Sequence, residues 1–323
     1  MKEVNLFNRR NFVKLSSLGA LSAIPLVSSA NNFLLDDDQN FKPLKIFVFS
    51  KPLQFLGYKE MSKVVKEMGF DGVDLTVRPK GHVLPENVLT DLPKATKAMQ
   101  KEGLLTGMLS TSVIDPSNEK DVAVLKTAHQ LGYSIYRTGW IKYDKNRPVA
   151  QSLEVYKKQL KDLSKLNAEI GITGGFQNHS GKYLGAPIWD LKLVLDGLAK
   201  QNLGIQYDIM HATVEGGQSW QVGLDYVKDQ INSLVIKDFK WINKNGKWKR
   251  TYVPLGEGMV DFDAYFKFLV KNKIDLPISL HLEYYLGGAE KGKQPIIDKE
   301  VIFEKMKKDL DFIRRHWAKA NDY

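Results

Sequence analysis

The chain has 323 residues, of which 43% are hydrophobic and 26% charged, a composition that fits a soluble globular protein and excludes a disordered or fibrous one. It contains no cysteine, which excludes disulfides, thiolate nucleophiles and cysteine-based zinc sites. The formal net charge is +10, but the lysines are spread along amphipathic segments instead of forming a basic arm, so the charge alone does not indicate a nucleic-acid-binding protein.

The first thirty residues have the features of an export signal. Arg9 and Arg10 precede a short, mildly apolar stretch that ends in small residues at Ala30. The arginine pair resembles that of twin-arginine signals, and the alternatives are an ordinary secretory signal or a basic amphipathic start. The apolar stretch is too short for a permanent span, and no later stretch reaches 18 apolar residues. We therefore expect a signal (1–30), a connector (31–42) and a periplasmic protein exported by the twin-arginine machinery, with no stable membrane span after signal removal.

Short runs rich in β-forming residues then alternate with longer helical patterns. The runs cover residues 45–50, 72–77, 104–109, 134–139, 172–177, 204–209, 233–238 and 277–283. Between them, apolar residues recur at helical spacing, as in Met61, Val64, Val65 and Met68. Glycines such as Gly69 stand where a helix would end and directly precede a strand. These eight β–α units predict an α/β fold, a single-domain (β/α)₈ TIM barrel over 43–323.

An open doubly wound sheet is the alternative fold for such an alternation. That fold would favour a glycine-rich phosphate-binding loop after the first strand. The corresponding segment here, SKPLQFLG at 50–57, is not such a loop. The sequence therefore favours the closed barrel, and we expect no nucleotide cofactor.

A basic and aromatic cluster surrounds Asn245 and Gly246. It combines several lysines and Arg250 with Trp241 and Trp248. A nucleic-acid-binding patch is one interpretation. An Asn-Gly pair is also the typical turn of a two-residue β-hairpin, and we favour a solvated hairpin. We therefore expect no nucleic-acid partner.

Four of the six histidines follow the predicted strands closely. They are His82, His179, His211 and His281. A single histidine is more often structural than catalytic. In TIM barrels, however, the active site lies at the carboxyl ends of the strands, and four histidines at that end predict a shared polar pocket.

Lys237 is the unusual residue of the seventh predicted strand. Because alternate residues of a strand share a face, it lies on the same side as Val235, toward the barrel interior. There it would lie near Asp208 and Glu283. Such a lysine either forms a structural buried ion pair or takes part in the chemistry of the site, and the sequence alone does not distinguish these two roles.

Several segments, taken in order, resemble the xylose-isomerase-like barrels of the sugar phosphate isomerase/epimerase superfamily. They are FQNHSG (176–181), QYDIMHATVEGG (206–217), LVIKDF (234–239), PLGEGMVDF (254–262) and PISLHLE (277–283). The resemblance covers nearly the whole chain after the signal. It implies proton transfer beside a sugar carbonyl, and one divalent metal bound by Glu, Asp, His and Glu from successive strands.

The chain departs from the family pattern at these ligand positions. Gln177 stands where the first Glu is usual, and Asp208 matches the Asp. Val235 replaces the His, and the last Glu corresponds to His281 or to Glu283. The resemblance therefore does not specify a complete set of ligands.

Two arrangements are open for the positive charge that such a reaction needs. In the first, Gln177, Asp208 and His281 bind a divalent metal, and this N/O set suits Mn²⁺ or Zn²⁺ better than Mg²⁺. In the second, the metal is lost and Lys237 supplies the charge.

The expected chemistry needs a base beside the reacting carbon and an electrophile at the carbonyl oxygen. Glu283 or His211 is the candidate base, and Lys237 or a metal is the candidate electrophile. Further residues near strand ends either bind substrate or only pack the rim. They are His82, Arg78, Arg137, Trp140, His179 and Glu215.

Three functions follow from this interpretation. The first is an isomerase or epimerase that moves a proton through an enediolate. Its substrate would be a non-phosphorylated sugar or keto-sugar, because sugar phosphates are normally cytoplasmic. The second is a 3-keto-glycoside lyase or hydratase, in which the same enolate expels a β-leaving group. The third is a non-catalytic carbohydrate-binding barrel. This alternative remains because Val235, which replaces the usual His ligand, cannot bind a metal. In each case the partner is a small carbohydrate.

Overall fold

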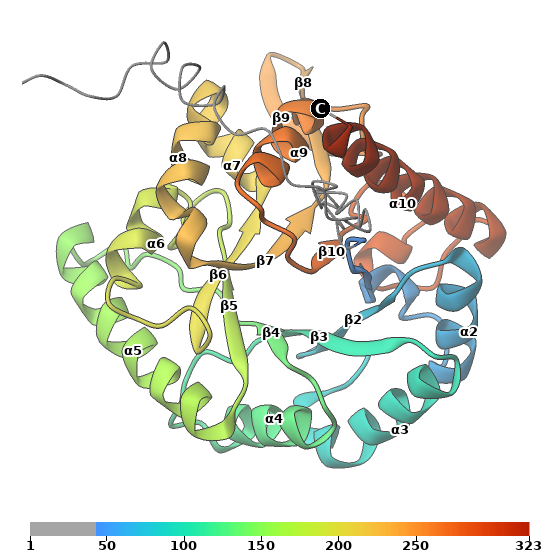
Figure 1. Cartoon of the computed structure of the whole chain (residues 1–323), viewed down its shortest axis with the longest axis horizontal. Helices are drawn as coiled ribbons and strands as arrows, with labels where there is room; N and C mark the ends of the chain where they lie inside the picture. Colours follow the sequence, from blue (N-terminus) through green and yellow to red (C-terminus); the bar gives the residue numbers. More distant parts are fainter. Residues whose placement is uncertain (1–42, 323) are drawn as a thin grey trace, which may run out of the picture. The chain divides into compact units, whose positions relative to one another are not determined.

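Eight parallel strands close into a barrel within residues 43–322, the part of the chain that the computed structural model describes (Figure 1). The strands are β1 (Ile46–Phe49), β2 (Gly72–Val77), β3 (Leu105–Thr111), β4 (Ile135–Arg137), β5 (Thr173–Gln177), β6 (Leu203–Asp208), β7 (Ile231–Ile236) and β10 (Ile278–Leu280). Their order around the barrel is β1-β10-β7-β6-β5-β4-β3-β2. The predicted (β/α)₈ fold is confirmed, and each predicted run overlaps one of these strands. The expected export signal and connector lie outside the described residues.

Amphipathic helices surround the barrel (Figure 1). They are α2 (Tyr58–Met68), α3 (Val88–Lys101), α4 (Glu119–Gln130), α5 (Val149–Ile170), α6 (Ile188–Val194), α7 (Ile209–Gly216), α8 (Trp220–Val227), α9 (Phe262–Lys271) and α10 (Lys299–Asn321). In α2, Met61, Val65 and Met68 are buried, as their spacing predicts. Gly69 ends α2 with a φ of 92°, a left-handed conformation that glycine adopts without strain, and β2 begins three residues later.

The ring of Phe47 lies in the barrel beside β2 and β3 because two neighbouring positions are glycine. A Cβ on Gly72 would lie 2.6 Å from this ring, and one on Gly107 would lie 2.8 Å from it. Phe47 is itself 2% exposed. Polar side chains are also buried within the strands, since Gln206 in β6 and Ser233 in β7 are fully buried.

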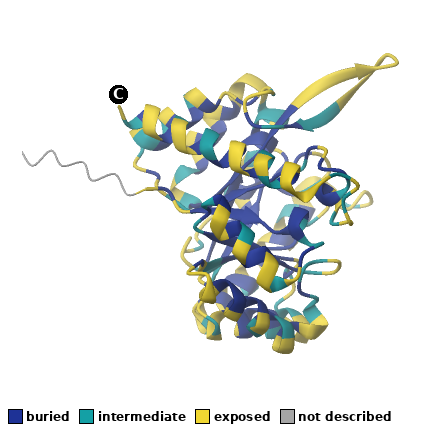
Figure 2. Cartoon of the chain, turned by 90° about the vertical axis from the view of Figure 1, so that its right-hand side faces the viewer, coloured by how far each residue is buried: buried dark blue, intermediate teal, exposed yellow. Residues whose placement is uncertain are grey.

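A β-hairpin projects from the barrel directly after β7 (Figure 2). Its strands are β8 (Asp238–Lys244) and β9 (Lys247–Val253), and they pair in an antiparallel register. Asn245 and Gly246 form the turn with φ angles of 55° and 75°, as a two-residue hairpin loop requires. The hairpin predicted from this dipeptide is confirmed. At its root the Asp238 carboxylate accepts backbone N–H groups from Gly256, Gly258 and Val260, which ties it to the following loop.

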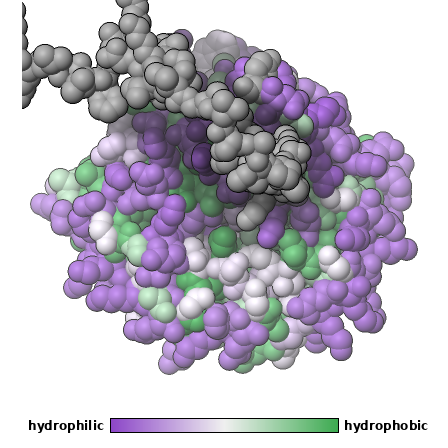
Figure 3. Space-filling view, viewed as in Figure 1, coloured by the Kyte–Doolittle hydropathy of each residue, from purple (hydrophilic) through white to green (hydrophobic). Residues whose placement is uncertain are grey.

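Hydrophilic side chains dominate the outer helices on the face seen in Figure 3, and hydrophobic ones appear there in small patches. Within residues 43–322, none of the helices is both long enough and apolar enough to span a bilayer.

Candidate active site

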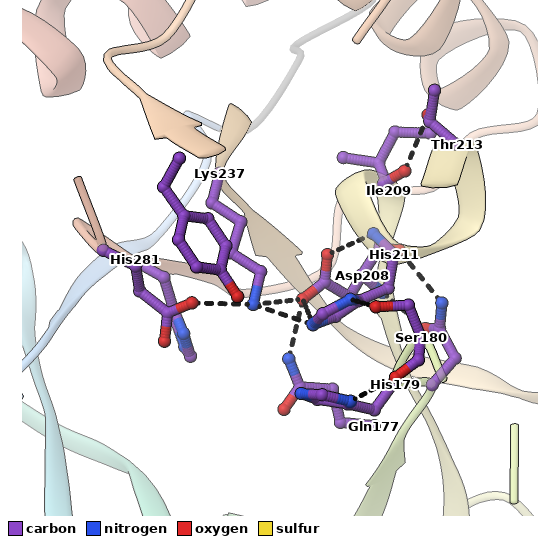
Figure 4. Close-up of polar contacts among 12 residues, drawn as sticks. Gln177, His179, Ser180, Asp208, Ile209, His211, Thr213, Lys237 and His281 are labelled. Carbon is purple, nitrogen blue, oxygen red and sulfur yellow. Dashed lines mark hydrogen bonds and ion pairs between the residues drawn. The ribbon is translucent and has the colours of Figure 1, made fainter. Parts of the chain in front are cut away.

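The ammonium group of Lys237 lies at the centre of a buried polar cluster (Figure 4). Its Nζ atom is 3.1 Å from Oδ2 of Asp208, 3.0 Å from Nε2 of His211 and 3.3 Å from Oε2 of Glu283. Only 4% of the Lys237 side chain is exposed. A buried ammonium is tolerated when charged and hydrogen-bonding groups surround it, and here three acceptors match its three N–H bonds. The structure thus brings together the residues that the sequence placed around an inward-facing lysine.

The ends of the strands position this cluster. Asp208 is the last residue of β6 and also the N-cap of α7, where its Oδ1 accepts the backbone N–H of His211 at 3.1 Å. This cap places His211 in the first turn of the helix, beside the carboxylate. Lys237 follows β7 directly, and Glu283 lies three residues after β10. All four side chains therefore come from the carboxyl ends of neighbouring strands.

The charges of Lys237 and Glu283 sustain each other. Burial by itself would favour the neutral amine, but Asp208 and Glu283 outweigh it and raise the pKa of Lys237. Burial would likewise raise the pKa of Glu283, but the nearby Lys237 outweighs it and lowers that pKa. At neutral pH the pair is therefore an ammonium and a carboxylate.

His211 is a neutral imidazole in this arrangement. Burial and the adjacent Lys237 hold its pKa well below the ordinary value. Because Lys237 donates to Nε2, the ring proton lies on Nδ1, which is 2.8 Å from Oγ of Ser180. Arg250 also donates a hydrogen bond to this hydroxyl. Both ring nitrogens of His211 are therefore engaged.

An aromatic group lies on the other side of His211. The ring of His179 is 4.1 Å from that of His211, 4.9 Å from Trp140 and 4.7 Å from Tyr183. The guanidinium of Arg137 stacks on Trp140 at 4.2 Å. Burial, followed by the charge of Lys237, lowers the pKa of His179 to about 4. Trp140 therefore contacts both Arg137 and His179, and all three were predicted to bind substrate.

The buried histidines should cost the fold stability as the pH is lowered through the range in which they would gain protons. Burial lowers the pKa of His82, His179, His211 and His281. At these four sites, between the ordinary value of 6.5 and the lower folded-state values, the unfolded chain binds more protons than the folded chain. Asp190 and Asp309 act in the opposite direction, because burial raises their pKa values to about 6. We therefore expect His179→Gln to gain melting temperature relative to the wild type as the pH falls from 7 to 5, and a constant difference between the two proteins over this range would contradict the expectation.

A second polar group lies deeper in the barrel, around Asp74. Its Oδ2 accepts hydrogen bonds from Ser110 at 2.9 Å and from Ser279 at 2.5 Å, and it lies 3.9 Å from Nε2 of His281. The His281 ring stacks on Phe49 at 4.0 Å. Burial raises the pKa of Asp74. His281 therefore belongs to this deeper group by its direct contacts.

Several buried polar atoms of the barrel have no hydrogen-bond partner among residues 43–322. They include Oδ1 of Asp74, Nη1 of Arg137, Oε1 of Gln177 and Nδ1 of His281. These residues come from β2, β4, β5 and the end of β10. Burying polar atoms without partners is costly, so such a group is suited to a ligand that carries several hydroxyls.

The predicted metal ligands do not form a site that fits a resident divalent metal. Gln177 lies next to Asp208, but it donates its amide Nε2 to Oδ2 at 2.7 Å, and Lys237 occupies the other side of that oxygen. Val235 offers no ligand atom, and His281 contacts Asp74 and not these two residues. Among residues 43–322, no group of three or more His, Cys, Asp or Glu side chains could hold a metal.

Other predicted substrate-binding residues have structural contacts. Nε2 of His82 lies 3.0 Å from the carbonyl oxygen of Leu56, so its contacts are with the loop after β1. Glu215 accepts the backbone N–H of Gly181 at 2.7 Å and orders the loop after β5. Arg78 lies over the ring of Phe49 at 5.4 Å, near the deeper polar group.

Sequence reasoning missed the contributions of Arg250 and Tyr252. Arg250 bonds to Ser180, and its Nη2 donates to the hydroxyl of Tyr252 at 3.1 Å. The ring of Tyr252 faces the Lys237 ammonium at 5.8 Å. Both residues lie on β9. The hairpin turn predicted from Asn245 and Gly246 could have identified them. It fixes the strand register, and Arg250 and Tyr252 are two residues apart, so their side chains share one face of the hairpin.

Comparison with known proteins agrees with the barrel fold. A family model described as xylose isomerase-like TIM barrel matches residues 62–315. No curated protein matches the chain.

Solved structures with the same fold include a 3-keto-D-glucoside 4-epimerase from E. coli, at 15% identity and a TM-score of 0.60, covering 84% of this chain and 99% of that one. A probable 3-DHS dehydratase from Bacillus anthracis matches at 17% identity and a TM-score of 0.59, covering 82% of this chain and 98% of that one. A xylose isomerase-like protein from Mycobacterium smegmatis, in complex with magnesium, matches at 15% identity and a TM-score of 0.57, covering 83% of this chain and 98% of that one. At these identities the similarity shows a shared fold.

Proposed function

Because the chain belongs to the family of xylose isomerase-like TIM barrels, as its motifs led us to expect, we propose that it is an isomerase- or epimerase-like enzyme. It moves a proton next to the carbonyl of a non-phosphorylated sugar or keto-sugar, through an enediolate. The observation that carries this proposal is the buried ammonium of Lys237 held beside the carboxylate of Glu283. Proton abstraction beside a carbonyl needs both groups, a positive charge at the oxygen and a base at the carbon.

The contact between Lys237 and Glu283 is the one that a substrate can replace. It is the longest of the three contacts of the ammonium, at 3.3 Å. The Glu283 side chain is also 19% exposed, whereas those of Asp208 and His211 are fully buried. The carbonyl oxygen of a substrate can replace Glu283 as the acceptor of a hydrogen bond from Lys237. The ammonium then polarises the carbonyl, and the Glu283 carboxylate is released from the ion pair in the same step.

The released carboxylate is a stronger base than the paired one. Lys237 lowers the pKa of Glu283, so moving the ammonium toward the substrate oxygen lets this pKa rise. Glu283 then removes the proton from the carbon beside the carbonyl. The electrons of the broken C–H bond form the enediolate, and Lys237 stabilises its oxygen. Protonation of the same carbon on the opposite face of the enediolate, by water or a second acid, gives the epimer, whereas transfer of the proton from Glu283 to the neighbouring carbon gives the isomer.

Two features support a sugar as the substrate. The unpartnered buried atoms of Asp74, Arg137 and Gln177 suit hydroxyl groups. The aromatic group around Trp140 and His179 offers flat apolar surface of the kind that packs against sugar rings.

In this proposal Lys237 takes the role that a divalent metal has in the wider family. Purified protein should therefore contain much less than one equivalent of divalent metal per chain. Mn²⁺, Zn²⁺ or Mg²⁺ should not raise the melting temperature, because the ammonium of Lys237 contacts Oδ2 of Asp208, the oxygen that a metal would need as a ligand. Elemental analysis and thermal unfolding test both statements. A stoichiometric metal whose removal by chelator lowers the melting temperature would show that the site does hold one.

Elimination from a 3-keto-glycoside is the second candidate, since the same enolate can expel a group from the β carbon. Similarity in fold to both a 3-keto-D-glucoside 4-epimerase and a probable dehydratase favours keeping it. Incubation with ketohexoses and with 3-keto-glucosides separates the two. Conversion to an epimer or isomer without release of the aglycone supports the first function, and aglycone release supports the second. If neither class is converted, both fail and a carbohydrate-binding barrel becomes the better description.

Export belongs to this proposal as well. It is supported by Arg9 and Arg10 before the apolar stretch that ends near Ala30. A periplasmic enzyme would meet free sugars and glycosides more often than sugar phosphates, which agrees with a non-phosphorylated substrate.

A further inference from the structure

The hairpin of β8 and β9 presents one face that is continuous with the candidate active site. Alternate residues of each strand share a face, and antiparallel pairing places residues of the two strands opposite each other. The pairs on this face, from the barrel outward, are Phe239 with Tyr252, Trp241 with Arg250, and Asn243 with Trp248. The lysines of the hairpin, Lys240, Lys244, Lys247 and Lys249, lie on the opposite face.

The inner part of this face reaches the reacting groups. Arg250 donates to the hydroxyl of Ser180, which in turn contacts His211, and Tyr252 faces the ammonium of Lys237. Trp241 lies opposite Arg250, and Trp248 is two residues from it, about 7 Å along the strand. The two tryptophans therefore lie on the same face as Arg250 and Tyr252, next to the outermost polar contacts of the site.

The outer part of this face is exposed and apolar. Trp241 is 40% exposed, Trp248 is 66% exposed, and both line one shallow surface with Met259, which is 55% exposed. Most of the hairpin stands away from the barrel (Figure 2). The three side chains offer on the order of 300 Å², whereas a stable protein interface buries about 800 Å² on each partner. The surface is the size of a small ring system and too small for a subunit interface.

We propose that this face, defined by Trp241, Trp248 and Met259, is a subsite for a second ring joined to the reacting sugar. The occupant is the flat apolar face of the next sugar or of an aryl aglycone, with Asn243 and Arg250 beside it for hydroxyls or the glycosidic oxygen. This inference rests on the proposed function, because the first ring is taken to lie at Lys237. It identifies the substrate as a glycoside with two rings in place of a single free sugar.

Binding by calorimetry tests the subsite with methyl, 4-nitrophenyl and glucosyl glycosides of 3-keto-glucose. The wild-type protein should bind the two-ring ligands about five- to tenfold more tightly than the methyl glycoside. Trp248→Ala should remove this advantage and leave the affinity for the methyl glycoside within about twofold. Trp189→Ala is the matched control, because Trp189 is 44% exposed on the outer helix α6 and stacks on Tyr226. It should bind every ligand as the wild type does.

The outcomes separate this inference from the function on which it rests. If the wild type binds neither the methyl glycoside nor a ketohexose, the proposed function fails and the subsite fails with it. If the wild type binds a ketohexose but not the methyl glycoside, the subsite alone fails. If the methyl glycoside binds but the second ring adds nothing, or if Trp248→Ala keeps the advantage, the subsite alone is overturned. A tighter fit only for the 4-nitrophenyl ligand would identify an aryl aglycone, and a tighter fit for both would identify a sugar. A change in sedimentation of Trp248→Ala without a change in binding would instead assign the face to a second copy of the chain.

Discussion

Lys237→Met should lower turnover at least about a hundredfold, the loss typical of removing one preorganised donor from a developing oxyanion. The methionine has a similar shape but no charge, so it cannot stabilise the enediolate oxygen. Steady-state kinetics on the substrate class identified by the product assay measure the loss. Turnover near the wild-type rate would exclude Lys237 as the electrophile.

This variant should also be less stable, which needs its own control. The methionine leaves Asp208 and Glu283 close together without the ammonium that compensates them, and breaking a buried pair typically costs about 3–5 kcal/mol. The partial exposure of Glu283 reduces that cost. Adding Asp208→Asn removes the fully buried charge and should recover much of the stability. The double variant should remain inactive, so a loss of rate can be separated from a loss of fold.

Glu283→Gln should lower turnover by about a hundredfold to ten-thousandfold, the usual contribution of a general base. The amide keeps an oxygen that can accept the hydrogen bond from Lys237 but loses the charge that the ammonium stabilises, so the melting temperature should fall, though less than in Lys237→Met. Kinetics and thermal unfolding measured together test this expectation. The matched control is Glu257→Gln, an exposed glutamate whose partner is Lys308, and it should behave like the wild type.

The two candidate bases make opposite predictions. Nε2 of His211 accepts from Lys237 and its Nδ1 lies beside Ser180, so a substrate would have to displace a buried contact to reach it. If Glu283→Gln retains its rate while His211→Gln loses it, the base is His211 and the assignment of Glu283 is wrong.

The barrel was predictable because its signals are local. Each strand run lies between helical patterns of ordinary length, and glycines such as Gly69 mark the helix ends. The meeting of Asp208, Lys237 and Glu283 was also predictable, since strand parity and the barrel rule place their side chains at one end.

The contacts of the other site residues depend on the conformations of the loops after the strands. The spacing of apolar residues in the sequence does not predict these conformations. His82 and His179 both follow strands, yet one bonds to the carbonyl of Leu56 and the other lies against His211. Arg250 reaches the site only because the hairpin turn returns the chain, as β9, to a position from which the Arg250 side chain contacts Ser180. His281 was assigned to a metal with Asp208, but its ring stacks on Phe49 and its Nε2 faces Asp74, a contact between residues more than 200 positions apart.

We expect the ammonium of Lys237 to support proton removal beside a sugar carbonyl without help from a metal ion. This step can be followed by proton NMR as hydrogen exchange from heavy water into a ketohexose or a 3-keto-glucoside. Chelator-treated wild-type protein should cause loss of the signal from the C–H bond next to the carbonyl, and Lys237→Met should cause no such loss. Exchange that appears only after a divalent metal is added, or that continues in Lys237→Met, would contradict this expectation.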